Sequence, residues 1–210
     1  MALITDIVQT TRNKGQMYEV FVDGESLGLY HIETIVKHRI VKGSNVDVEK
    51  LTNALVESGT LLAMEKTLNL ISKSMKTEKE IKDYLKGKNY NDKIIENVIC
   101  KLNEYNYIND EVYAKYFVSC HSKKQGNKKL KFDLIKKGVS EEVINSVLDE
   151  TEEDLQGLKH LAEKYLKNKV KDFKTKSKLF AHLASKGYNY DNINKVINEF
   201  DWSEQNEDWL

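Results

Sequence analysis

Residues 126–148 read GNKKLKFDLIKKGVSEEVINSVL, and this stretch carries the pattern that decides the fold. Leu130 and Leu134, four residues apart, lead to Gly138, and Ser140 with two acids follows. Apolar residues at helical spacing before a glycine indicate a helix that ends there, because glycine readily adopts the left-handed conformation of a helix stop. A serine followed by acids is typical of a helix start. The stretch therefore predicts two short helices joined by a tight turn.

The same pattern recurs at a separation of 49 residues on either side, which indicates internal repeats. The helix stops fall at Asn89, Gly138 and Gly187. A further helix precedes each pair, so each copy is predicted to be a unit of three helices. The apolar positions that align in this register are Leu68, Phe117 and Leu166; Ile81, Leu130 and Leu179; and Leu85, Leu134 and Leu183.

Before the repeats, the sequence predicts a small β-containing region. Residues 17–22 are rich in β-branched and aromatic side chains, Asp23 and Gly24 form a hairpin-turn pair, and residues 27–30 supply the returning strand. Residues 3–8 are a candidate third strand. The β structure is thus confined to the N-terminal part of the chain.

Two helix starts can also be read from capping residues. Asp47 is placed as the N-cap of a helix that we expect to end near Ser58 and Gly59. Thr77 with Glu80 forms a capping box for the middle helix of the first copy.

The predicted fold class is mainly α, with three tandem three-helix repeats forming an elongated curved array behind the small β-hairpin-containing N-terminal region. Stacking is expected because a unit of about 50 residues buries little surface alone. The predicted boundaries are 1–58 for the N-terminal strand and helix region, then 59–109, 110–151 and 152–210 for the repeats. The last repeat includes an acidic tail with Glu199, Asp201, Glu204, Glu207 and Asp208.

Composition limits the possible classes of protein. There is no proline, which leaves long helices unbroken, and lysine plus arginine balance aspartate plus glutamate at 33 each. Cys100 and Cys120 are too few for a disulfide framework, which favours a reducing compartment. No apolar run approaches the roughly 20 residues of a membrane span. We therefore expect a cytoplasmic protein that is neither secreted nor membrane-bound.

No motif for catalysis, a cofactor or a metal is found. The ten glycines form no phosphate-binding loop, and the five histidines never occur at the spacing of a helical metal pair. Acidic clusters at residues 78–83 and 152–154 are explained by helix starts, where acids interact favourably with the helix dipole. The sequence predicts a binding protein that is not an enzyme and has no cofactor.

Lysines gather at one place in each copy, the junction between the first and middle helices. Such a basic track fits a phosphate backbone or an acidic groove on a protein, and the sequence leaves both open. The candidate partner-binding residues are Lys73, Lys76, Lys123, Lys124, Lys128, Lys129, Lys131, Lys171, Lys174 and Lys176.

The central repeat resembles the signature of bacterial RecX proteins. The resemblance rests on residues 107–110, then Tyr113 with Ala114, then Gly126, and it extends to most of the chain. The signature residues are Asp110, Gly126, Leu130, Leu134, Gly138 and Gly187. Two departures are Lys76, where the family often has arginine, and Asp133, where it usually has glutamate; lysine keeps the charge but loses the bidentate fork.

The resemblance implies a protein that binds the RecA recombinase and its filaments on single-stranded DNA, and we expect this protein to be a monomer. RecX proteins modulate, and usually inhibit, the ATPase, strand exchange and filament growth of RecA in recombination, DNA repair and the SOS response, and many also bind DNA. An alternative from a different class is a direct DNA-binding protein whose three-helix modules act like helix-turn-helix units.

Overall fold

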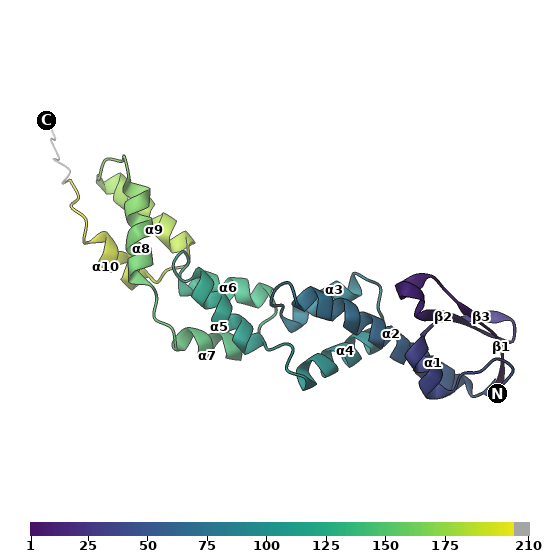
Figure 1. Ribbon diagram of the computed structural model, residues 1–210. Coiled ribbons are helices and arrows are strands. Elements are labelled where there is room, and N and C mark those ends of the chain that lie inside the picture. The colour runs from purple at the N-terminus through teal and green to yellow at the C-terminus, as the bar shows by residue number, and fades with distance from the viewer. Residues whose placement is uncertain (204–210) are drawn as a thin grey trace. The chain divides into compact units, whose positions relative to one another are not determined.

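The computed structural model describes residues 1–203, so Glu204, Glu207 and Asp208 of the expected acidic tail lie outside the described residues. The chain divides into two compact units, Met1–Ile108 and the part that begins at Asn109. The first unit contains the strands and the first repeat, and the second contains the other two repeats (Figure 1).

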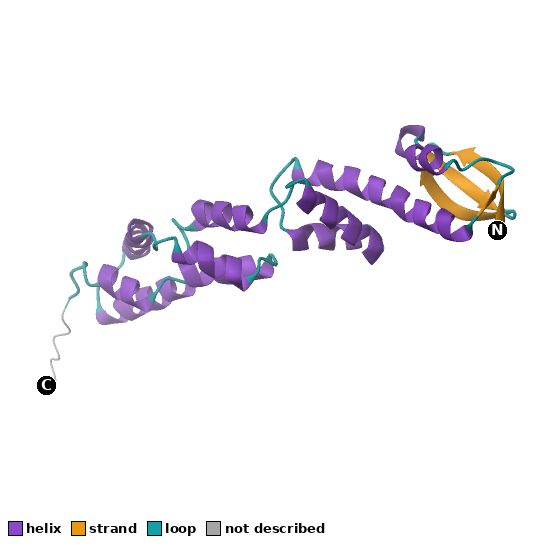
Figure 2. Ribbon diagram, turned by 90° about the horizontal axis from the view of Figure 1, so that it is seen from below, coloured by secondary structure: helices purple, strands orange, loops and turns teal. Residues whose placement is uncertain are grey.

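The first unit begins with an antiparallel sheet, drawn in orange in Figure 2, whose strands lie in the order β3-β2-β1-β4. Its strands are β1 (Ala2–Gln9), β2 (Met17–Val22), β3 (Glu25–His31) and β4 (Asn45–Val46). Asp23 and Gly24 join β2 to β3 with φ of 48° and 89°, as a two-residue type I′ turn requires. The predicted hairpin and third strand are confirmed. The sequence reading missed β4, the 3₁₀ turn Arg12–Gly15 and helix α1 (Ile32–His38).

Helix α2 (Val48–Ile71) starts after Asp47, as predicted, but its predicted end near Ser58 and Gly59 is wrong. The helix continues because both residues serve packing. Ser58 is buried and its hydroxyl accepts the backbone N–H of His31 at 3.0 Å. A Cβ on Gly59 would lie 2.4 Å from Ile94 Cδ1, so glycine allows close helix packing here. The boundary proposed at residue 58 thus falls inside one continuous helix.

Each repeat consists of three helices around its own apolar core. Repeat 1 uses the second half of α2 with α3 (Glu78–Lys86) and α4 (Asp92–Glu104). Repeat 2 contains α5 (Asp110–His121), α6 (Asn127–Lys136) and α7 (Glu141–Asp149). Repeat 3 contains α8 (Leu155–Leu166), α9 (Phe173–Ser185) and α10 (Tyr190–Ile197).

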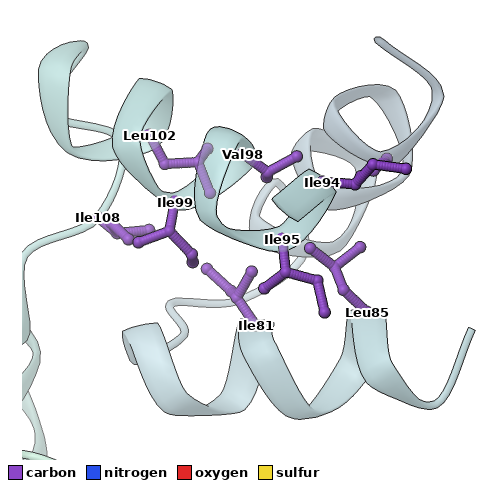
Figure 3. Packing of buried hydrophobic residues seen from close by; sticks show 9 residues of the cluster. Ile81, Leu85, Ile94, Ile95, Val98, Ile99, Leu102 and Ile108 are labelled. Carbon is purple, nitrogen blue, oxygen red and sulfur yellow. The ribbon is translucent and has the colours of Figure 1, made fainter. Parts of the chain in front are cut away.

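The 49-residue register is reproduced in the cores. The two aligned middle-helix positions are fully buried in all three copies: Ile81, Leu130 and Leu179, and Leu85, Leu134 and Leu183. Figure 3 shows Ile81 and Leu85 directed at the apolar face of α4, which contributes Ile95 and Ile99. The helical fold class, the three-helix repeats and the strand-containing N-terminal region are therefore confirmed, while the curved array stays a prediction.

The predicted turns are also confirmed in detail. Asn89, Gly138 and Gly187 have φ of 61°, 87° and 88°, the left-handed conformation that ends the middle helix of each copy. The next helix is then capped by the side chain of Asn91, Ser140 or Asn189.

Candidate partner-binding surfaces

The predicted lysines lie where the sequence placed them, at the connection between first and middle helices and at the start of the middle helix. Lys73 and Lys76 lie between α2 and α3, and Lys123 and Lys124 lie between α5 and α6. Lys128, Lys129 and Lys131 are in α6, Lys171 precedes α9, and Lys174 and Lys176 are in its first turns. Their role in binding stays a prediction.

The lysines differ in how strongly they are held within the protein. The Nζ atom of Lys129 lies 2.9 Å from Asp133 Oδ1, one helical turn away. Lys131 Nζ donates to Asn145 Oδ1 at 2.9 Å and lies 3.8 Å from Glu141 Oε2. Both side chains are half-buried, whereas Lys123 and Lys124 are exposed. The exposed pair is therefore better placed than the α6 pair to meet a partner.

The N-terminus of α6 is covered by repeat 3. The N–H of Gly126 donates to the carbonyl of Lys186 and the N–H of Lys128 donates to that of Gly187, each at 3.0 Å. A Cβ on Gly126 would lie 2.3 Å from the Tyr188 backbone, and one on Gly187 would lie 2.3 Å from Lys129 N. Only glycine allows the backbones of repeats 2 and 3 to come this close, so both glycines are needed for the contact between the two repeats.

Glu153 reinforces the same joint, and the sequence reading explained it only as an acid near a helix start. One carboxylate oxygen accepts the Asn127 N–H at 2.9 Å. The other accepts the Asn189 N–H at 3.1 Å and the Asn192 side-chain amide at 2.7 Å. A single carboxylate thus satisfies donors at the starts of α6 and α10, where the helix dipoles favour negative charge.

Exposed aromatic rings lie among the lysines of the second unit. Phe132 is 50% exposed, and its ring centre lies 5.1 Å from Lys129 Nζ and 4.3 Å from Lys136 Nζ. Tyr190 is 54% exposed, with Lys128 Nζ 4.1 Å from its ring centre. The sequence reading missed these rings, although a phenylalanine between lysines in residues 128–137 was a visible signal.

Comparison with known proteins identifies the family. Three family models match in succession: "RecX, first three-helix domain" at residues 63–102, the second such domain at 109–148 and the third at 152–197. The chain belongs to the RecX family. It is 36% identical over 203 residues to the regulatory protein RecX of Clostridium perfringens, covering 94% of this chain and 95% of that protein. Identity to the Clostridium acetobutylicum protein is 33%, covering 95% and 96%.

Two solved RecX structures share the fold. One, a crystal structure of regulatory protein RecX, superposes with a TM-score of 0.71 at 22% identity and covers 95% of this chain and all of that one. The other, RecX from Lactobacillus salivarius, has a TM-score of 0.61 at 26% identity and covers 67% of this chain and 96% of that one.

In this RecX family member, the signature residues have structural roles. Asp110 is the first residue of α5, Gly126 is the N-cap of α6, and Leu130 and Leu134 are buried. Gly138 and Gly187 occupy left-handed turns. These positions therefore support the helix starts, cores and turns of the repeats.

The described residues offer no assembled metal site and no membrane span. Within residues 1–203, no three His, Cys, Asp or Glu side chains gather closely enough to hold a metal ion. No helix in the same range is both long and apolar enough to cross a bilayer.

Proposed function

We propose that this protein is a non-enzymatic regulator that binds RecA and its filaments on single-stranded DNA and inhibits ATP hydrolysis, strand exchange and filament growth. Membership in a family named as regulatory, with all three RecX three-helix domains matched, is the observation that carries the proposal. The proposal includes a monomeric protein that works in the cytoplasm, in recombination, DNA repair and the SOS response.

The exposed junction lysines support this proposal by their charge. Lys123 and Lys124 extend from a connection between helices, where they can reach an anionic surface without disturbing a core. Binding alone is enough to reduce ATP hydrolysis and growth of a RecA filament, because a ligand that prefers one state of a partner shifts the partner toward that state. No bond needs to be made or broken by this chain.

The test is a titration of cognate RecA, assembled on single-stranded DNA, with this protein. ATP turnover and filament length are followed together, and both should fall as the protein is added. Unchanged ATP turnover at several-fold excess would contradict the proposal.

The helix-turn-helix alternative is less well supported by the surface charges. In such a module the last helix enters the DNA major groove. In repeat 2 that helix is α7, which exposes Glu141, Glu142 and Asp149. Carboxylates at these positions repel the phosphates that flank a groove. Tight, salt-dependent binding to a duplex in the absence of RecA would support the alternative.

A further inference from the structure

The chain turns back after α10 and lies against the connection between α8 and α9. The N–H and the hydroxyl of Ser203 both donate to the carbonyl of Lys171, each at 2.9 Å. The indole N–H of Trp202 donates to the carbonyl of Ile197 at 2.8 Å. These bonds hold residues 199–203, here named the C-terminal strap, beside the basic junction of repeat 3.

Two rings of the C-terminal strap lie beside two of the junction lysines. Lys171 Nζ lies 5.5 Å from the ring centre of Phe200, and Lys176 Nζ lies 5.8 Å from that of Trp202. At such distances the face of a ring attracts a cation. Both rings also pack, partly buried, against the core of repeat 3. The strap therefore engages two amines that the sequence assigned to a partner.

The chain end and the connection beside it have opposite charges. Residues 199–210 contain five acids and no lysine or arginine, whereas residues 167–178 contain six lysines and one acid. Within the strap, Glu199 accepts a hydrogen bond from the amine of Lys159 of α8 at 2.6 Å. Opposite charges attract, and the same acids repel an anionic partner that approaches the lysines. The end of the chain thus carries the charge that the junction lysines are expected to bind.

The rings of the strap are particular to repeat 3. In the 49-residue register, the positions of Phe200 and Trp202 are Thr151 and Glu153 in repeat 2. There Glu153 bonds the starts of two helices, and the junction lysine Lys123 is exposed. The repeat fold therefore forms in repeat 2 without rings at these positions.

The contacts of the strap suit a cover that can be displaced. The attraction between a lysine and a ring at the surface is weak, and chain ends open at low cost in free energy. A phosphate or carboxylate offers the same amine a charge-assisted hydrogen bond, which is among the stronger contacts in proteins. An anionic partner can therefore take Lys171 and Lys176, but only by opening the strap.

We propose that the C-terminal strap is an autoinhibitory contact, in which the end of the chain competes with an anionic partner for Lys171 and Lys176. The partner binds these lysines only in molecules whose strap is open, so the apparent affinity falls in proportion to the open fraction. The consequence for RecA rests on the proposed function, whereas the competition itself is tested without RecA.

The first experiment follows opening of the strap in the full chain by the fluorescence of Trp202. Trp209→Phe leaves Trp202 as the single tryptophan. Inorganic polyphosphate, an anion without fluorescence, is added while calorimetry records its binding. As binding saturates, the Trp202 emission should move to longer wavelength and become open to quenching by acrylamide, because the ring leaves a half-buried site. Lys171→Gln with Lys176→Gln should abolish this change.

The second experiment removes the rings of the strap with Phe200→Ala and Trp202→Ala together. This variant should bind polyphosphate about tenfold more tightly than the natural chain, which corresponds to a strap open in about 10% of natural molecules. It should also inhibit RecA at a correspondingly lower concentration. The matched control is Tyr105→Ala with Tyr107→Ala, a pair of exposed rings 5.9 Å apart in the first unit. The control should bind polyphosphate like the natural chain.

Two results would overturn the proposal. One is a Trp202 emission that stays unchanged at saturating polyphosphate, or polyphosphate that does not bind at all. The other is a folded double variant whose affinity for polyphosphate is unchanged or weaker. The fluorescence experiment keeps both rings, so it decides the proposal even when circular dichroism shows that the double variant has lost its helices. If neither chain affects the RecA ATPase while polyphosphate opens the strap, the proposed regulation fails and the strap stands.

Discussion

Single residues at the joint between repeats 2 and 3 show how local chemistry decides the packing of whole units. Gly126 has a φ of −81°, which any residue can adopt, so its glycine is required by space and not by backbone conformation. The backbone of Tyr188 fills the position that a Cβ would occupy. Glu153 then bridges the two helix starts that meet there.

Gly126→Ala is therefore expected to destabilise the protein by about 1–3 kcal/mol, the cost of forcing an extra carbon into a packed site. Urea unfolding of the full chain, followed by circular dichroism, measures the effect. Gly87→Ala is the control, because the nearest atoms to its Cβ would lie 3.4 and 3.5 Å away, ordinary contacts. The control should be neutral or slightly stabilising. Equal losses for both variants would contradict the packing role of Gly126.

Two buried tyrosines, Tyr30 and Tyr188, differ in whether the hydroxyl is hydrogen-bonded. The hydroxyl of Tyr30 donates to the carbonyl of Leu51 at 3.0 Å, whereas the hydroxyl of Tyr188 has no hydrogen-bond partner among the described residues. Burial raises the pKa of the Tyr30 phenol to about 12, and burial together with the nearby carboxylates of Asp154 and Glu153 raises the pKa of the Tyr188 phenol to about 12. Both rings are therefore held in the neutral form.

Folding raises these pKa values above the ordinary value of 10.0. The contribution of each neutral phenol to the free energy of unfolding is therefore complete below pH 10 and is lost as the pH rises toward 12. Tyr30→Phe should cost about 1 kcal/mol at neutral pH, since it removes a hydrogen bond, and Tyr188→Phe should cost nothing. Tyr188→Phe should also reduce the loss of stability at alkaline pH. Unfolding measured at pH 7 and pH 11 checks both statements, and a destabilised Tyr188→Phe variant would show that its hydroxyl has a partner.

At the scale of elements, capping residues decide where the short helices begin. The Thr77 hydroxyl accepts the Glu80 N–H at 3.2 Å, and the Glu80 carboxylate accepts the Thr77 N–H at the same distance. This reciprocal pair satisfies two donors that the helix itself leaves unpaired. Thr77 is completely buried, so water cannot replace the cap.

Thr77→Ala should reduce the free energy of unfolding by about 1–2 kcal/mol, the usual loss when an N-cap oxygen is removed. Thr77→Ser, which keeps the oxygen, should recover most of that loss. Hydrogen exchange of the α3 amides locates the effect, because an uncapped helix opens first at its start. Unaltered exchange in α3 would place any loss of stability elsewhere.

The length of α2 shows how packing overrides a local signal. Ser58 and Gly59 form a typical helix end in sequence, and propensity alone disfavours glycine within a helix. In the folded chain the serine is bonded to β3 and the glycine faces Ile94 of α4. Both residues contact segments that are distant in sequence, and capping residues, which report only on the local chain, give no sign of such contacts.

At the scale of the molecule, the two compact units carry different surfaces. The first unit combines a sheet with a helical repeat and exposes the junction lysine Lys73, while the second exposes the junction lysines Lys123 and Lys124.

A double charge reversal, Lys123→Glu with Lys124→Glu, is expected to weaken inhibition of RecA. The matched control is Lys50→Glu with Lys93→Glu, since these lysines are also exposed but lie within α2 and α4, outside the junctions. Both variants change the net charge by the same amount. The RecA ATPase titration should shift to higher protein concentration, by roughly tenfold or more, only for the junction variant. An equal shift for the two variants would indicate a general charge effect.

The sequence by itself determined the three repeats, their register, their helix stops and the N-terminal hairpin. These features depend on apolar periodicity, left-handed turn residues and capping side chains, which act over a few residues and can be read directly. Only the tertiary structure revealed the continuous α2 and the glycine joint closed by Glu153. Those features depend on which residues meet across long separations in sequence, because close approach, hydrogen-bond partners and shared exposure exist only once the helices have packed.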